Sequence, residues 1–119
     1  MNTWDVAKKW KDMCEQGKNL ECINELYAEN VVSKEMPGMP GEVISGRQNV
    51  WNKSKDWLES VEDFHASSIS EPVVAGNFFT AKMDFDCTFK ERGRQKMEEV
   101  CVYEVKDGKI ASEQYFYTM

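Results

Sequence analysis

Three glycine-containing dipeptides divide the second half of the chain into segments in which apolar and polar residues alternate. They are Gly76-Asn77, Arg92-Gly93 and Asp107-Gly108, and each is a residue pair that closes tight two-residue β-hairpins. The segments around them are four predicted strands, over residues 63–71, 77–90, 95–106 and 109–117. Because each turn joins neighbouring strands directly, the sequence predicts an antiparallel meander.

The first half of the chain has the spacing of helices instead. Val6, Trp10 and Met13 recur at about one helical turn, and similar patterns predict helices over residues 3–16, 19–28 and 45–60. The expected N-terminal caps are Thr3, Asn19 and the box Ser45-Gly46-Arg47-Gln48.

Between the second and third helices the sequence predicts a short strand and a loop. The strand covers residues 31–35, and Met36-Pro37-Gly38-Met39-Pro40-Gly41 must be a loop because Pro and Gly interrupt both kinds of element. Helices gathered in one half and strands in the other favour an α+β fold. The 119 residues fit one domain, over residues 1–119.

Charge and cysteine spacing argue against several classes of partner. A formal net charge of -6 disfavours nucleic acid and anionic membranes, because both repel an acidic surface. The four cysteines form no C-x-x-C pair and the chain has one histidine, so we expect reduced thiols, no metal site and no cofactor. No apolar run is long enough to span a membrane, and residues 1–11 lack the apolar core of a secretory signal. We therefore expect a cytoplasmic protein.

The turns also predict which side chains share a face of the sheet, since hairpin type fixes strand register. With Arg92-Gly93 at the corner, Glu91 pairs with Arg94; with Asp107-Gly108, Lys106 pairs with Lys109. The face expected to pack on the helices then carries Met83, Phe85, Glu98, Val100, Val102, Glu113, Tyr115 and Tyr117. In this register Glu98 lies opposite Tyr117, and Glu113 lies opposite Val102. His65 faces outward, beside Thr88.

The strand from Glu98 to Ile110, with its Asp107-Gly108-Lys109 turn, and the aromatic segment Glu113-Gln114-Tyr115-Phe116-Tyr117 resemble the SnoaL-like branch of the NTF2-like superfamily. Residues 25–32 and Ser45-Gly46-Arg47 support the resemblance. It implies a cystatin-like cone, with three N-terminal helices packed on a curved antiparallel sheet around a pocket. It also implies a homodimer through the outer sheet face. The scaffold hosts isomerases, cyclases, hydrolases and non-catalytic binders, so the resemblance indicates a fold more than a reaction.

Two carboxylates are the predicted catalytic residues, one from the resemblance and one from the strand register. In the related ketosteroid isomerases the base follows a Tyr-Ala-Asp-Asp stretch, and Tyr27-Ala28-Glu29-Asn30 puts Glu35 at the matching position. Glu113 is the expected partner, because a buried carboxylate either has a hydrogen-bond partner or holds a proton. The acidic donors of those isomerases do not carry over, since their positions fall near Trp10 and near Val102 or Cys101, so steroid isomerisation is not expected.

Two readings of function remain open. The first is cofactor-independent acid–base chemistry, isomerase- or cyclase-like, on a small apolar or aromatic carbonyl compound. The second is a non-catalytic homodimeric module that binds a ligand or a protein, with Glu35 in solvent and Trp and Met side chains filling the cone as ordinary core. The predicted ligand-binding residues are Trp10, Met13, Trp51, Trp57, Met83, Phe85, Glu98, Val100, Val102, Tyr115 and Tyr117.

Overall fold

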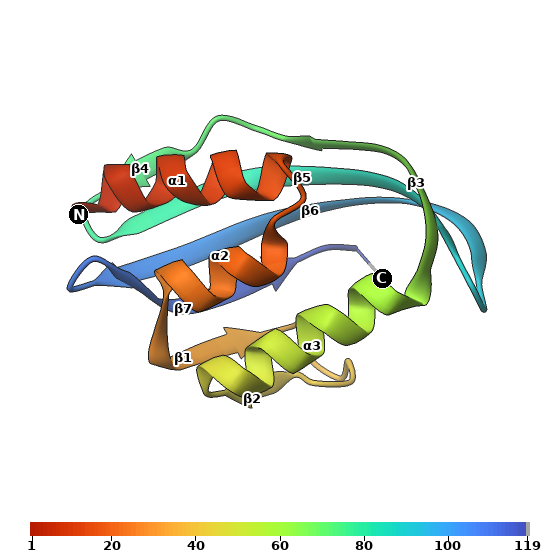
Figure 1. The fold of residues 1–119 in the computed structure, drawn as a ribbon, viewed down its shortest axis with the longest axis horizontal. Coiled ribbons are helices and arrows are strands. Elements are labelled where there is room, and N and C mark those ends of the chain that lie inside the picture. Colours follow the sequence, from red (N-terminus) through yellow and green to blue (C-terminus); the bar gives the residue numbers. More distant parts are fainter. Residues whose placement is uncertain (119) are drawn as a thin grey trace.

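A computed structural model describes residues 1–118 and consists of three helices against one sheet. The helices are α1 (Thr3–Glu15), α2 (Asn19–Leu26) and α3 (Arg47–Ser60). The strands are β1 (Tyr27–Lys34), β2 (Val43–Ser45), β3 (Val61–Ile69), β4 (Val73–Ala75), β5 (Phe78–Phe89), β6 (Gly93–Lys106) and β7 (Lys109–Phe116). All three helices cover the same face of the curved sheet (Figure 1). The predicted domain extends to Met119, which lies outside the described residues.

The sheet is mixed, with the order β2-β1-β7-β6-β5-β3, while β4 pairs with β5. The predicted α+β class is therefore confirmed, but the fully antiparallel sheet is not, because β1 runs parallel to β7. That pairing joins residues about 80 positions apart, such as Ser33 and Glu113, and no hairpin signal announces it. The last strand thus lies between the first strand and β6 (Figure 1).

The N-terminal caps of the three helices differ from the predicted ones. Asn2, not Thr3, caps α1, and it forms a reciprocal capping box with Asp5. Asn19 is the first residue of α2 rather than its cap. Gly46 caps α3 with φ 95°, and no side chain bonds the first turn, so the predicted serine box is not formed.

Two of the three predicted hairpins are confirmed, and the third is wrong. Ala75 pairs with Phe78, and Lys106 pairs with Lys109 across an Asp107-Gly108 turn whose residues have φ of 51° and 75°. At the long hairpin, however, Phe89 pairs with Gly93, leaving the three residues 90–92 in the turn. Gly93 has φ 75°, which suits the left-handed position that ends a three-residue hairpin.

This change of turn moves the register of β6 by an odd number of residues and exchanges its two faces. Glu99 pairs with Met83 and Tyr103 with Phe79, on the face that packs against the helices. Glu98, Val100 and Val102 therefore lie on the outer face, where the Glu98 side chain is 75% exposed. A bulge after Glu104 also sets Glu113 opposite Tyr103 instead of Val102.

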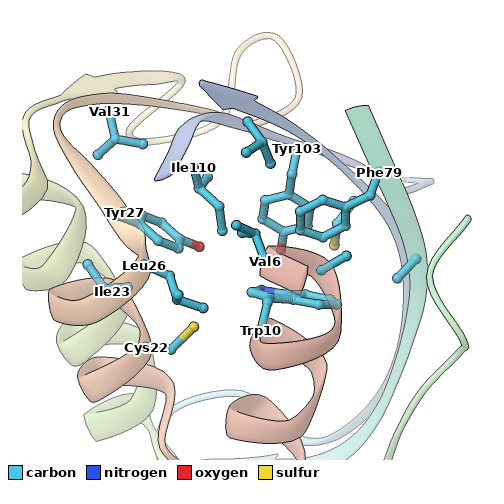
Figure 2. Close-up of a cluster of buried hydrophobic side chains, with 14 of the residues drawn as sticks. Val6, Trp10, Cys22, Ile23, Leu26, Tyr27, Val31, Phe79, Tyr103 and Ile110 are labelled. Atoms are coloured by element: carbon cyan, nitrogen blue, oxygen red, sulfur yellow. The ribbon is translucent and has the colours of Figure 1, made fainter. Parts of the chain in front are cut away.

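An aromatic core fills the space between α1, α2 and the sheet. The ring of Trp10 lies 4.9 Å from that of Tyr103 and 5.5 Å from that of Phe79 (Figure 2). Phe79 and Tyr103 stack at 4.7 Å with an angle of 14° between their planes. Val6 and Leu26 close the cluster from the helices. In residues 1–118 no helix combines the length and apolarity needed to cross a bilayer.

A second, smaller cluster lies beneath the C-terminal half of α3. Trp57 packs against Phe64, Phe85 and Phe89, with ring centres 5.5–6.0 Å apart. Val61 and Cys87 complete it. All four cysteines are free, and Cys22, Cys87 and Cys101 are buried, in line with the prediction of reduced thiols.

Candidate functional site

Glu113 is a buried carboxyl held by two hydroxyl groups of β1. Tyr27 donates its phenolic hydrogen to Oε1, and the Ser33 hydroxyl donates to Oε2 at 2.6 Å. The Glu113 residue is only 2% exposed, and the parallel pairing of β1 with β7 sets Ser33 directly beside it. Burial, together with the charge of Glu113, raises the pKa of Tyr27 well above its usual value. The phenol therefore remains a donor to Glu113 at neutral pH.

Lys53 extends from α3 toward Ser33 and Glu113 and connects them to Glu35. Its Nζ donates to Ser33 Oγ at 2.9 Å and to Glu35 Oε2 at 3.0 Å. The ammonium also lies 5.4 Å from the centre of the Tyr115 ring, within range of a cation–π contact. The Lys53 and Glu35 side chains are 23% and 18% exposed, so the ion pair is screened only partly by solvent.

Tyr117 occupies the other oxygen of Glu35. Its hydroxyl donates to Glu35 Oε1 at 3.0 Å, and the two groups come from 82 positions apart in the chain. Burial and this hydrogen bond to Glu35 raise the pKa of Tyr117 to about 12. Both carboxylate oxygens of Glu35 are thus engaged, by a phenol and an ammonium. The predicted pairing of Tyr117 with Glu98 is replaced by this contact.

Glu99 is the third carboxyl of the cluster and has the weakest partner. Within residues 1–118 the Cys101 thiol is its one side-chain donor, with Sγ 3.7 Å from Oε1. Burial, and next the negative charge of Glu35, raises the pKa of Glu99 to about 7, against which Lys53 acts only weakly. A carboxyl that titrates near neutral pH and lacks a strong donor is suited to accept or give a proton.

The structure therefore gathers four of the predicted site residues and separates the others. Glu35, Glu113, Tyr115 and Tyr117 lie in one polar cluster. Trp10 and Met83 are buried in the main core, Met13, Trp51 and Phe85 pack against it, and Trp57 centres the second cluster. Glu98, Val100 and Val102 lie on the opposite face of the sheet. Whether any of them touches a ligand stays a prediction.

The sequence reasoning missed Ser33, Lys53 and Glu99. Lys53 follows the buried Val50 by three positions, and this spacing was a usable signal that it faces inward. Glu99 was hidden by the register of one turn. The indole N–H of Trp51 is buried without an acceptor in the described part of the chain.

Two hollows lie on the surface beside α3. One of about 590 Å³ is lined by residues 40, 41 and 43–45 and by Asn49, Asn52, Lys53 and Asp56. The other, of about 300 Å³, lies at the start of α3 and includes Asn24, Glu29 and Arg47. The first matters for the cluster, because the Lys53 side chain borders it. Among residues 1–118, no three His, Cys, Asp or Glu side chains lie close enough to hold a metal ion.

Three helices on a curved mixed sheet are the architecture of the NTF2-like or cystatin-like fold. A protein of cystatin-like fold from Xanthomonas campestris superposes with a TM-score of 0.83 over 100% of this chain and 92% of its own, at 20% identity. A hypothetical protein with a ketosteroid isomerase-like fold from Catenulispora acidiphila, in complex with trimethylamine, gives a TM-score of 0.76 over 96% of this chain and 85% of its own, at 16% identity. At these identities the likeness shows the fold alone.

The chain belongs to the SnoaL-like domain family, whose model matches residues 1–117. A SnoaL-like protein of Mesorhizobium loti, assigned provisionally as a polyketide cyclase, shares 33% identity, with a TM-score of 0.92 over 98% of this chain and 100% of its own. Among curated proteins none matches. The predicted family and fold are thereby confirmed.

Proposed function

We propose that this SnoaL-like protein binds a small, largely apolar carbonyl compound beside the polar cluster and exchanges a proton with it through Glu99. The observation that carries the proposal is the state of Glu99, a largely enclosed carboxyl with a pKa of about 7 and no strong donor. General bases work best when their pKa lies near the working pH. Removal of a proton next to a carbonyl group is the isomerase- or cyclase-like step for which such a base is suited.

The contacts assign Glu35 and Glu113 supporting roles in this proposal. Both oxygens of Glu113 accept hydroxyl hydrogens, and both oxygens of Glu35 accept donors as well. Each of these oxygens already accepts a hydrogen bond from a hydroxyl or ammonium group, whereas Glu99 has only the weak thiol donor and is the freest of the three to meet a substrate. Their negative charges support the function by favouring the protonated form of Glu99. Tyr117 is the phenol best placed to turn toward a substrate oxygen.

The test is exchange of the hydrogens on the carbon beside the carbonyl group. It is monitored by proton NMR in deuterated water, with cyclohexanone and phenylacetone as probes. We expect the protein to speed deuterium incorporation beside the carbonyl, with a rate that rises as pH passes through about 7, because the unprotonated carboxylate is the active form. Glu99→Gln should lower the rate by about a hundredfold or more.

Glu98→Gln is the matched control, since Glu98 is the adjacent residue on the outer face. It should exchange both ketones like the unmodified protein. Equal rates for the Glu99 and Glu98 variants, or no exchange above the buffer rate, would reject the acid–base proposal.

A second candidate function, a homodimeric module, is favoured by an apolar patch on the outer face of the sheet. Val100 and Phe116 lie directly opposite each other there, and each is 44% exposed. Lys82, which lies opposite Val100 on β5, forms ion pairs with Asp84 and Glu98 beside the patch. An apolar centre with a charged surround is a common design of a homodimer interface.

Replacement of Phe116 by glutamate should therefore weaken self-association by at least about tenfold, because two like charges would meet across the twofold axis. Size-exclusion chromatography with light scattering measures the mass across a dilution series. Trp4→Glu is the control, since Trp4 is 48% exposed on α1, on the other side of the sheet. A monomeric unmodified protein at all concentrations would exclude this candidate.

A further inference from the structure

We infer that the groups around the Lys53 ammonium form a binding site for alkyl ammonium ions, which Lys53 fills from within the chain and which an amine ligand takes by displacing it. The inference rests on the proposed function in placing the ligand at the same cluster, and it adds that the carbonyl compound carries a protonated amine. It is carried by the geometry of the contacts that the ammonium already makes.

The contacts are those of an ammonium receptor. Lys53 Nζ donates to a carboxylate oxygen of Glu35 at 3.0 Å and to the hydroxyl of Ser33 at 2.9 Å, and the Tyr115 ring lies 5.4 Å from it. A carboxylate, a neutral oxygen and an aromatic ring are the three kinds of group that stabilise a protonated amine. A free alkyl ammonium ion carries the same three hydrogens as Lys53 and can make the same contacts.

The acceptors are fixed in place before any amine arrives. The Ser33 hydroxyl gives its hydrogen to Glu113 at 2.6 Å, so only its lone pairs are left to face the ammonium. Ser33 itself is fully buried. The Tyr117 hydroxyl holds the second oxygen of Glu35 at 3.0 Å. Orientation by a second layer of hydrogen bonds is typical of sites built for one kind of group.

The charges in the cluster favour a cation. The negative charges of Glu35 and Glu113 both raise the pKa of Glu99, and the Lys53 ammonium opposes them. If the ammonium of Lys53 leaves, the cluster holds only acidic groups, which is costly in a partly buried place. A cationic ligand restores the balance, whereas an anion adds to the repulsion.

Lys53 also has a place to which it can move. Its side chain is 23% exposed and borders the hollow of about 590 Å³ that Asp56 helps to line. Asp56 lies three residues further along α3, a spacing that brings two side chains together on a helix. The flexible stem of a lysine allows the swing from Glu35 toward Asp56. Because Lys53 is part of the chain, its ammonium is present at a high effective concentration. It therefore competes with a free amine and lowers the apparent affinity of that amine for the site.

Replacement of Lys53 by alanine tests the inference, because it empties the site and removes the competitor. We expect Lys53→Ala to unfold at a lower temperature, and n-butylammonium at millimolar concentration to restore a large part of the loss. Neutral n-butanol and anionic butyrate should not restore it. By isothermal titration calorimetry, n-butylammonium should bind Lys53→Ala at least about tenfold more tightly than the unmodified protein.

Two variants set the background. Lys55→Ala removes a neighbouring lysine that is 50% exposed and pairs with Glu59, so n-butylammonium should not raise its unfolding temperature. Lys53→Ala combined with Glu35→Gln should lose the rescue, because the carboxylate is gone. Equal rescue by n-butanol and n-butylammonium, or equal effects on the Lys53 and Lys55 variants, would overturn the inference.

If Lys53→Ala does not fold, NMR of the unmodified protein tests the inference instead. Titration with n-butylammonium should move the Lys53 Cε signal in a saturable way, while the Lys55 signal stays in place; no saturable shift would overturn the inference. The amine experiments report contacts of Lys53 and need no turnover, whereas deuterium exchange reports Glu99. Failure of one proposal is thus distinguishable from failure of the other.

Discussion

Replacing Trp10 by alanine is expected to lower the free energy of unfolding by about 3–5 kcal/mol. Trp10 is 1% exposed and is one of the largest fully buried side chains. Its indole contacts both Phe79 and Tyr103, which come from two strands of the sheet (Figure 2). Removal therefore takes away the largest side chain that α1 packs against the stacked rings of β5 and β6, and leaves a cavity there.

Urea denaturation followed by circular dichroism measures this loss, and Trp4→Ala is the matched control. Trp4 lies on the same helix, six residues earlier, but is 48% exposed. Its replacement should change stability by no more than about 0.5 kcal/mol. Similar losses for the two variants would mean that α1 is not anchored to the sheet by its buried indole.

The second large effect is expected for Glu113→Ala, at about 2–5 kcal/mol of unfolding free energy. The change leaves the buried hydroxyls of Tyr27 and Ser33 without an acceptor and opens a gap between β1 and β7. Unpaired buried polar groups keep the full cost of leaving water, and two of them arise here from one substitution.

Glu113→Gln distinguishes the loss of the acceptor from the loss of the charge. The amide keeps one oxygen acceptor and nearly the same shape, so its cost should be clearly smaller than that of alanine. Glu98→Ala serves as the exposed control. Chemical denaturation at neutral pH gives all three values, and a cost for Glu113→Ala no larger than for Glu98→Ala would show that the buried contacts add nothing to stability.

Much of the architecture could be predicted from local patterns. Helical spacing located the three helices, and alternation with glycine turns located β5, β6 and β7 to within a few residues. The hairpin at Asp107-Gly108 was read correctly because two successive left-handed residues fit a single turn type. Glu113 and Tyr115 do point toward the helices as expected, but for another reason: the changed register of β6 and the bulge after Glu104 each shift the faces by an odd number of residues, and the two shifts cancel.

The error at Gly93 shows the limit of such reading. One left-handed glycine fits a two-residue turn and also the end of a three-residue turn, and the sequence around Arg92 does not decide between them. The consequence is large since a strand has a period of two. The sequence predicted Glu98 on the inner face and Glu99 on the outer face, so the carboxyl with the raised pKa was placed on the wrong side of the sheet.

The remaining part of the cluster depends on contacts between distant segments. Glu35 meets Lys53 from α3 and Tyr117 from beyond β7, and Ser33 meets Glu113 only because β1 and β7 are parallel. A lysine on a short amphipathic helix is more often a solvent-facing residue than a buried partner. The spacing from Val50 indicates the face of α3 on which Lys53 lies, but only the packing of α3 against β1 shows that its ammonium meets Glu35.

The position of β7 between β1 and β6 has a consequence for biosynthesis. Since β7 is synthesised after the other described strands, β1 and the two helices before it lack their central neighbour until β7 has emerged from the ribosome. Closure of the sheet then joins residues from opposite ends of the chain, which is a slow, high-contact-order step. During that interval the apolar faces of α1 and α2 are open to chaperones, and a truncation that removes β7 would leave two half-sheets with exposed edges rather than a shorter cone.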